Sequence, residues 1–269
     1  MAHFYLDGDL TPEGCLPGAL VTLGGPEARH AVTVSRVHPG EPLLLGNGSG
    51  LVLNGTVEST QGGQSPGGAS LTLRVETATV TPAASPRIRL VQALAKGDRD
   101  EMAVQAATEL GIDGIVPWLA GRSVSRWEGA KVAKGRERWT SIVREASKQS
   151  IRAWLPSVAE LSSTKQLAVL ASETRMLLLE PTATLRLTEV AVRFAAADAD
   201  AADAADAADA ADARDIVLVV GPEGGLSPAE ISVLQGAGAT SVRLGDTVLR
   251  TSTAGPAALA VLNAALHRW

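Results

Sequence analysis

The apolar runs of this chain change character once, near the two prolines at positions 82 and 86. Before them, short apolar runs are separated by glycine pairs and by Asn-Gly dipeptides such as Asn47-Gly48, a pattern typical of hairpins. After them, wholly apolar runs such as Ile216–Val220 alternate with helical patterns, which is typical of a parallel sheet buried on both faces. The sequence therefore predicts a small antiparallel β-barrel over residues 1–78, a linker over 79–86 and an α/β domain over 87–269.

Local signals give the elements of each part. Strands are expected at 19–23, 42–45, 51–53 with Val57, 71–75, 88–94, 115–116, 176–179, 216–220 and 241–244, with a short helix over 26–37 and a long helix over 129–152. Ser227-Pro228-Ala229-Glu230 marks another helix start, because it combines an N-cap serine, a proline at the first helical position and a glutamate at the third.

One more helix is expected after Asp98, which would cap it together with Glu101 at the third position. Met102, Ala106 and Leu110 recur every fourth residue and form the expected buried stripe, and Gly111 ends the helix.

Composition excludes several classes of protein. The chain has 269 residues, 45% hydrophobic and 20% charged, with no apolar run long enough to span a bilayer and no signal-peptide pattern at its start. We therefore expect a soluble, cytoplasmic protein without a membrane partner. Cys15 is the only cysteine and the four histidines are scattered, so we expect no internal disulfide and no metal site.

The net charge of −5 hides two local biases. An Asp/Ala low-complexity run over 195–213 reads as a solvated insertion without chemistry. Residues 121–154 contain nine basic and three acidic residues. Trp127, Trp139 and Trp154 lie within this segment, and Trp118 lies shortly before it. A segment of this kind is typical of a surface that binds single-stranded RNA, and the alternative is a solvated helix face. Trp139 falls on the apolar face of the long helix, so Trp127 is the better candidate for a surface residue.

Two glycine-bearing loops follow buried strands. Gly221-Pro222-Glu223-Gly224-Gly225 follows the strand at 216–220, Gly245 follows the strand at 241–244, and Glu180-Pro181 ends a third strand. Ligands of open α/β sheets bind outside the carboxyl ends of the strands, so these loops are candidates for a ligand site, although glycines also serve tight turns. Neither loop is a nucleotide-binding phosphate loop, because no Gly-Lys-Ser/Thr or Gly-x-Gly-x-x-Gly is present there.

Two longer motifs are specific to a known family. The stretch from Leu218 through Gly-Pro-Glu-Gly-Gly to Ser227, followed by Leu244-Gly-x-x-Val-Leu-Arg-Thr-x-Thr-Ala254, resembles the RsmE family of 16S rRNA (uracil-N3)-methyltransferases in the SPOUT superfamily. Val37-His38-Pro39-Gly40 with His30, Lys96-Gly-Asp-Arg99 and Arg144-Glu-Ala-Ser-Lys-Gln149 also match. The resemblance covers nearly the whole chain except the Asp/Ala run.

The resemblance implies a PUA-like RNA-binding barrel, followed by an α/β SPOUT domain that is tied in a deep trefoil knot and works as a homodimer. It implies S-adenosylmethionine (SAM) as cofactor and 16S rRNA of the small ribosomal subunit as partner. Arg250 would lie near the reacting centre as the catalytic residue, and Glu223 would shape the cofactor loop.

Carried onto this chain, the resemblance predicts two sets of site residues. The cofactor-binding set is Leu178, Leu179, Glu180, Val220, Gly221, Pro222, Glu223, Gly224, Gly225, Leu244, Gly245, Val248, Leu249, Arg250, Thr253 and Ala254. The RNA-binding set is His30, Arg36, Lys96, Arg99, Arg122, Arg126, Trp127, Lys148 and Arg152.

The chain departs from the family pattern in two places. Thr251-Ser252-Thr253 stands where Thr-Glu-Thr is common, which removes a carboxylate beside the cofactor, and 148–152 lacks the usual glycine turn and one acidic group. The proton acceptor for a uridine N3–H is therefore not identified. Two alternatives stay open: a related methyltransferase acting on tRNA or on ribose oxygen, whose usual signature is missing here, and a non-catalytic RNA-binding protein that keeps the fold.

Overall fold

The computed structural model describes residues 3–62, 68–194 and 214–269, which form two compact units. The first unit contains Met1–Ala83 together with Ser147–Leu155, and the second contains Ala84–Ala146 and Pro156–Trp269. Residues 195–213, the expected Asp/Ala insertion, lie outside the described part of the chain.

The first unit is built on one sheet with the strand order β1-β3-β4-β5-β2. Its strands are β1 (His3–Leu6), β2 (Leu20–Leu23), β3 (Pro42–Gly46), β4 (Leu51–Gln61) and β5 (Ser70–Val80). The predicted strands are confirmed, and β5 continues into the first two residues of the expected linker. The predicted helix at 26–37 is shorter, formed by α1 (Gly25–Arg29) and a π-helical turn (His30–Val34).

This sheet differs from the expected antiparallel barrel in two ways. The strand β1, for which the sequence pattern gives no sign, pairs parallel to β3, so the sheet is mixed. In the described residues, the edge strands β1 and β2 do not pair with each other, so no closed barrel forms. A four-residue strand whose partner lies about 40 positions away carries no local turn signal, which is why sequence patterns miss it.

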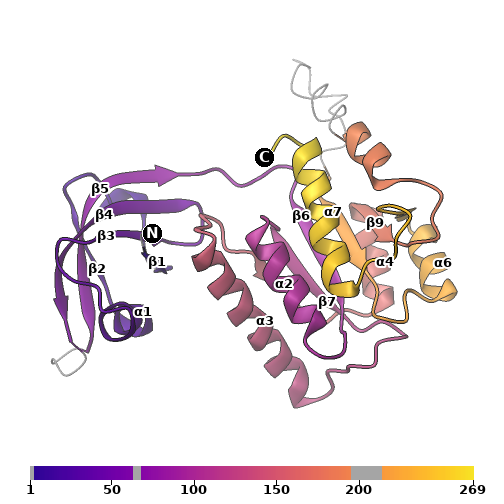
Figure 1. The fold of residues 1–269 in the computed structure, drawn as a ribbon, viewed down its shortest axis with the longest axis horizontal. Coiled ribbons are helices and arrows are strands. Elements are labelled where there is room, and N and C mark those ends of the chain that lie inside the picture. The colour runs from indigo at the N-terminus through magenta and orange to yellow at the C-terminus, as the bar shows by residue number, and fades with distance from the viewer. Residues whose placement is uncertain (1–2, 63–67, 195–213) are drawn as a thin grey trace. The chain divides into compact units, whose positions relative to one another are not determined.

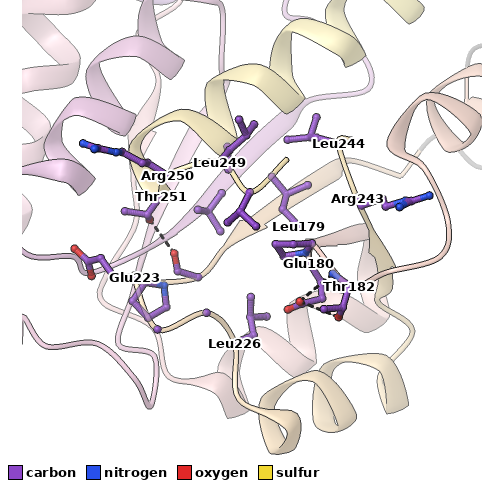
Figure 2. Close-up of a pocket in the computed structure, with 18 of the residues that line it drawn as sticks. Leu179, Glu180, Thr182, Glu223, Leu226, Arg243, Leu244, Leu249, Arg250 and Thr251 are labelled. Carbon is purple, nitrogen blue, oxygen red and sulfur yellow. Dashed lines mark hydrogen bonds between the residues drawn. The ribbon is translucent and has the colours of Figure 1, made fainter. Parts of the chain in front are cut away.

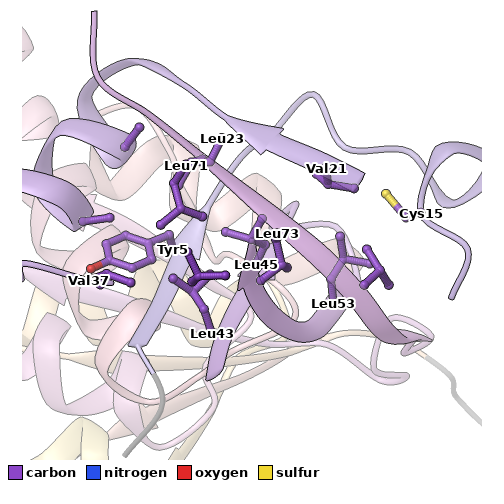
Figure 3. Packing of buried hydrophobic residues seen from close by; sticks show 14 of the residues in the cluster. Tyr5, Cys15, Val21, Leu23, Val37, Leu43, Leu45, Leu53, Leu71 and Leu73 are labelled. Carbon is purple, nitrogen blue, oxygen red and sulfur yellow. The ribbon is translucent and has the colours of Figure 1, made fainter. Parts of the chain in front are cut away.

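One face of the sheet carries the core of the first unit. Burial alternates along β4, where Leu51, Leu53, Gly55 and Val57 are buried and the residues between them are half-buried, as expected for a strand with a single packed face. Figure 3 shows Leu43, Leu45, Leu53, Leu71 and Leu73 gathered with Tyr5 in this core.

The end of the long helix α3 (Ala130–Gln149) belongs to the first unit. The Ile151 backbone adopts a left-handed conformation, with φ 54°, and the Arg152 amide donates to the Ser147 carbonyl over 2.9 Å. This is the glycine-type helix end, in which a left-handed residue follows the last turn. The expectation that the turn is lost with its glycine is therefore wrong: an isoleucine adopts it, at the steric cost of a branched side chain with positive φ.

The second unit contains a wholly parallel sheet in the order β11-β9-β10-β6-β7-β8. Its strands are β6 (Ile88–Ala93), β7 (Gly114–Trp118), β8 (Ser157–Val158), β9 (Arg175–Leu179), β10 (Ile216–Val220) and β11 (Thr240–Val242). Every residue of β7, β9 and β10 is buried, which confirms the parallel sheet predicted from the apolar runs.

Helices cover both faces of this sheet. On one face, α2 (Arg99–Glu109) and α7 (Thr251–Ala265) pack on each other and on β6 (Figure 1). On the other face, α4 (Thr164–Glu173) and α6 (Pro228–Gly236) pack on each other, on β9 and on β11. Both start with a serine capping box; the one at Ser227 was predicted. Among the described helices, none is long and apolar enough to cross a bilayer.

Two details of α2 correct the sequence-based expectation. Asp98 has a left-handed backbone, and its side chain caps nothing. Met102 of the expected stripe is 60% exposed, whereas Ala103, Val104 and Ala107 are buried. The face with the smaller side chains is the buried one because it lets α2 approach α7 closely.

The contact of α7 with the sheet depends on Gly255. A Cβ atom there would lie 2.9 Å from Leu90 Cδ1 and 3.4 Å from Val220 Cγ2, both in the buried sheet. We expect Gly255→Val to lower the free energy of unfolding by about 1–3 kcal/mol through overpacking. The measurement is urea unfolding, with Gly236→Val as control, since a Cβ at this helical position meets nothing within 4 Å. Equal stability of the two variants would contradict the close packing.

Candidate functional site

Three segments that follow neighbouring strands converge at the carboxyl edge of the second sheet and enclose a cavity of about 560 Å³. They are the loops after β9, β10 and β11, the three that the sequence analysis selects. The cavity is lined by Arg99, Arg122, Leu179, Glu180, Pro181, Thr182, Val220, Gly221, Pro222, Glu223, Gly224, Gly225, Leu226, Val242, Arg243, Leu244, Gly245, Thr247, Val248, Leu249, Arg250, Thr251 and Ala254.

The loop after β10 folds back on itself, and this requires glycine. A Cβ on Gly221 would lie 2.9 Å from Leu226 Cδ1 and 3.1 Å from the Leu226 amide nitrogen. The Gly225 backbone has φ 67°, in the left-handed region, and its amide donates to the Pro222 carbonyl over 2.9 Å. Glycine at 221 is thus required by the close approach of Leu226, and glycine at 225 by its left-handed backbone.

Two arginines hold the outer side of this loop. Arg122 Nη1 donates to the carbonyls of Gly224 and Leu226, over 2.8 and 3.1 Å. Arg99 Nη1 donates to Glu223 Oε1 over 3.2 Å, and the Lys96 amide donates to the same oxygen over 3.0 Å. Burial acts to raise the pKa of Glu223, but the backbone hydrogen bonds and the charge of Arg99 outweigh it and lower that pKa, so the carboxylate stays ionised.

Glu230 fixes the other end of the loop. Its Oε1 accepts from the Gly121 amide over 2.7 Å, and its Oε2 accepts from the Ser227 amide over 2.8 Å. The side chain is buried, which acts to raise its pKa, but these hydrogen bonds outweigh burial and lower the pKa of Glu230. Glu230 therefore joins the capping box of α6 to the turn that carries Arg122.

The start of α7 closes the cavity. Thr251 Oγ1 donates to the Gly221 carbonyl over 2.8 Å and accepts from Gln92 Nε2 over 2.9 Å, with both side chains buried. Gln92 comes from β6, so one buried hydrogen-bond chain links the strand, the first turn of α7 and the loop after β10.

The walls of the cavity are largely apolar. Figure 2 shows Leu179, Leu226 and Leu249 around its interior, while the side chains of Arg250 and Glu223 extend away from this apolar group. Glu180 accepts hydrogen bonds from the amide and hydroxyl of Thr182, over 3.3 and 3.1 Å. Apolar walls with a few fixed polar groups are typical of a site for a small organic ligand.

The structure brings most of the predicted cofactor-binding residues together. All of them line the cavity except Leu178, which is buried in the core on the α4 and α6 face, and Thr253. Thr251 also lines the cavity but is absent from the predicted set, although Thr-x-Thr belongs to the motif that carries the resemblance. Thr182 and Leu226 are absent from it too, and their only sequence signal is a position directly after the predicted loops.

The predicted RNA-binding residues fall into separate groups. Arg99 and Arg122 line the cavity itself, while Lys96 and Trp127 line a second cavity in the same unit. The other residues of this set that lie at the surface are His30, Arg36 and Arg126, with Arg152 half-buried. Lys148 lies 3.3 Å from Glu27 with 10% of its side chain exposed, which leaves little of it to meet a phosphate.

Two of the tryptophans near the basic segment belong to the core. Trp118 and Trp139 are buried, which confirms the core position of Trp139 and removes Trp118 as a surface for RNA. In the part of the chain that the structure describes, no cluster of three or more histidine, cysteine or acidic side chains could hold a metal ion.

Comparison with known proteins agrees with this geometry. Residues 82–263 match the family model described as an RNA methyltransferase domain. The ribosomal RNA small subunit methyltransferase E of Mycobacterium bovis is 40% identical over 257 residues, 94% of this chain and 89% of the relative. The Bacillus subtilis protein of that name is 27% identical over 98% of this chain and 96% of its own. The chain belongs to the ribosomal RNA small subunit methyltransferase E (RsmE) family.

Solved structures extend the similarity of this RsmE-family chain to the fold. A putative methyltransferase from Legionella pneumophila, in complex with the bound cofactor SAM, is 28% identical with a TM-score of 0.78, covering 98% of both chains. The ribosomal RNA small subunit methyltransferase E from Neisseria gonorrhoeae, bound to S-adenosyl methionine, is 26% identical with a TM-score of 0.75, again over 98% of both chains.

The hydrogen bonds of the buried Glu230 carboxylate can be tested for their contribution to stability. Glu230→Gln removes the charge and one acceptor, and we expect it to lower the free energy of unfolding at neutral pH by about 1–3 kcal/mol. Because the folded-state pKa of Glu230 is lowered, its contribution is complete above the unfolded-state pKa and is lost as pH falls through the folded-state value. Urea unfolding at neutral and acid pH checks this: the gap between wild type and variant should shrink in acid, and a constant gap would contradict the assignment.

Proposed function

We propose that this protein transfers the methyl group of SAM to N3 of a uridine in the 16S rRNA of the small ribosomal subunit. The observation that carries the proposal is the cavity formed by the loops after β9, β10 and β11 in a chain of the RsmE family. Relatives of this fold bind SAM, as the names of the solved structures state.

The lining of the cavity fits such a cofactor. The backbone of the loop after β10 lines the cavity from Gly221 to Gly225, and the leucines at 179, 244 and 249 supply apolar walls. These residues would hold the cofactor, with Glu223 and Glu180 as polar contacts at the ends. When bound, SAM supplies a methyl group on a positively charged sulfur, which a ring nitrogen can attack directly.

Arg250 is the residue that we assign to the reacting base. It lines the cavity immediately before α7, and its side chain is exposed and extends away from the apolar walls (Figure 2). Uridine N3 becomes a nucleophile only when it loses its proton, and a guanidinium near O2 or O4 would stabilise the resulting anion. Ser252 brings no carboxylate to this turn, so water or another group takes the proton.

We assign RNA binding to the first unit and catalysis to the second. The first would act as a PUA-like RNA-binding domain, corresponding to residues 1–78, with 79–86 as a linker and 87–269 as the catalytic SPOUT domain. His30 and Arg36 of the first unit, with Arg126 and Arg152 of the basic segment, are exposed or half-buried and would contact RNA phosphates. The function implies a location in the cytoplasm, where ribosomal subunits assemble.

The C-terminal segment would form the deep trefoil knot. Its support is a crossing beyond β11: the Arg243 amide donates to the Leu185 carbonyl over 2.9 Å, and the Leu187 amide donates to the Arg243 carbonyl over 2.8 Å. The chain that follows Arg243 then returns to Gly221 through Thr251. We further propose that the enzyme is a homodimer, which light scattering of the purified protein measures.

The function is tested by methyl transfer from radiolabelled SAM to small ribosomal subunits that lack the modification. We expect one methyl group on 16S rRNA, identified as N3-methyluridine by mass spectrometry of nucleosides. Gly221→Ala should weaken SAM binding by about tenfold or more, since the added methyl group displaces the loop. Gly236→Ala is the matched control, because its Cβ has no close neighbour.

The outcomes separate the alternatives. A methylated tRNA or ribose oxygen would replace the substrate in this proposal. SAM binding or RNA binding without any transfer would favour a non-catalytic protein that keeps the fold. Unchanged SAM affinity in Gly221→Ala would contradict the cofactor site.

Arg250 has a test of its own. In single-turnover methylation with saturating SAM and RNA, we expect Arg250→Ala to lower the rate constant by about 100-fold or more, the usual effect of removing a group that stabilises a developing anion. SAM affinity should stay within about twofold of wild type. Arg250→Lys should restore part of the rate because it keeps the charge, and an unchanged rate in Arg250→Ala would end the assignment.

A further inference from the structure

A second cavity, of about 340 Å³, lies in the second unit beside the segment that borders the first. It is lined by Ala95, Lys96, Gly97, Asp98, Asp100, Glu101, Val124, Ser125, Trp127, Gly135, Arg138 and Trp139. The two cavities flank the same short stretch of chain, because Arg99 lines the first and its neighbours Asp98 and Asp100 line the second. Arg138 of α3 pairs with Glu101 of α2 over 2.8 Å at this place.

The aromatic wall of this cavity is formed by Trp127 and Trp139, and Trp127 packs against a glycine inside a helix. Trp127 is half-buried and packs edge-on against the buried Trp139, with ring centroids 5.1 Å apart. A Cβ on Gly135 would lie 2.3 Å from Trp127 Cε2, so the indole lies directly against the backbone of α3. Glycine is unfavourable inside a helix, and its presence here is explained by the room that the indole needs.

The charges in the cavity argue against an anionic ligand. Its lining includes three carboxyl side chains, those of Asp98, Asp100 and Glu101, and two cationic ones, Lys96 and Arg138, of which Arg138 is paired with Glu101. Asp100 is buried, and its two oxygens accept hydrogen bonds from the amides of Ala95 and Glu101. A carboxyl oxygen has two lone pairs, so Asp100 can also accept a hydrogen bond from a ligand that carries an N–H donor.

We infer that this cavity binds one unstacked base of the RNA substrate, next in the strand to the uridine that is methylated at the edge of the first cavity. This rests on the proposed function. The base would stack on the half-buried indole of Trp127, and an N–H group of the base would donate to Asp100. An unstacked base on an aromatic side chain is the usual way in which proteins read single-stranded RNA.

The shared segment explains why the two bases would be neighbours. The Lys96 amide and the Arg99 guanidinium both bind Glu223 of the loop after β10, so this stretch is fixed against the first cavity. The Lys96 side chain is exposed at the edge of the second cavity, where it can meet the phosphate between two nucleotides.

Binding is measured by fluorescence anisotropy of a labelled single-stranded oligouridine of about 12 nucleotides, within the range of sites on single-strand-binding proteins. We expect Trp127→Ala to weaken binding by about 5- to 100-fold, the usual effect of losing one stacking platform. Trp127→Phe should keep most of the affinity but lose the quenching of indole fluorescence that the RNA causes in the wild type.

Two further variants distinguish a role of Trp127 in RNA binding from a role in stability alone. Gly135→Ala leaves the indole in the sequence but displaces it, and should weaken RNA binding in the same direction. Val169→Ala is the control, since this side chain is 61% exposed on α4, outside both cavities. SAM affinity and the midpoint of thermal unfolding should be unchanged in Trp127→Phe.

The readout separates this inference from the proposed function. Oligouridine binding needs no methyl transfer, so a dependence on Trp127 without any transfer would support the cavity as an RNA site and reject only the reaction. Normal transfer with unchanged RNA binding in Trp127→Ala would overturn the inference. Loss of SAM binding instead of RNA binding would also overturn it, because the cavity would then serve the cofactor.

Discussion

The site depends on one buried hydrogen-bond chain, from Gln92 through Thr251 to the Gly221 carbonyl. These three residues come from β6, from the first turn of α7 and from the loop after β10. Because the chain is excluded from water, breaking it would leave buried polar groups without partners. It therefore fixes where the C-terminal helix begins relative to the glycine loop, and with it the shape of the cavity.

Around this chain, carboxylates and arginines are used mainly to hold backbone. Arg122 binds two carbonyls of the glycine loop, Glu230 binds two amides at its far end, and Glu223 binds the Lys96 amide. Fixed hydrogen bonds of this kind let a loop with three glycines keep one conformation. Such preorganisation matters for methyl transfer, where the position of the nucleophile supplies much of the rate.

Elements with a local sequence signature were predicted, whereas features that depend on contacts between distant residues were not. The buried strands at 176–179 and 216–220, the capping box at Ser227 and the end of α2 at Gly111 have local signatures, and all are confirmed. The strand β1, the buried face of α2 and the placement of Lys148 have none. Met102 is exposed because the small residues beside it allow the closer contact with α7, which no periodicity of α2 alone reveals.

The sequence by itself determined the parallel sheet, the loops that bound the cavity and the family, because apolar runs, glycines and motifs act locally or are read directly. Only the tertiary structure decided that Arg99 and Arg122 brace the glycine loop, that Trp127 lies on Gly135 beside a buried aspartate, and that Leu178 turns into the core. These depend on contacts between residues far apart in the chain. Whether a side chain meets a ligand or a neighbour is set by what folds against it.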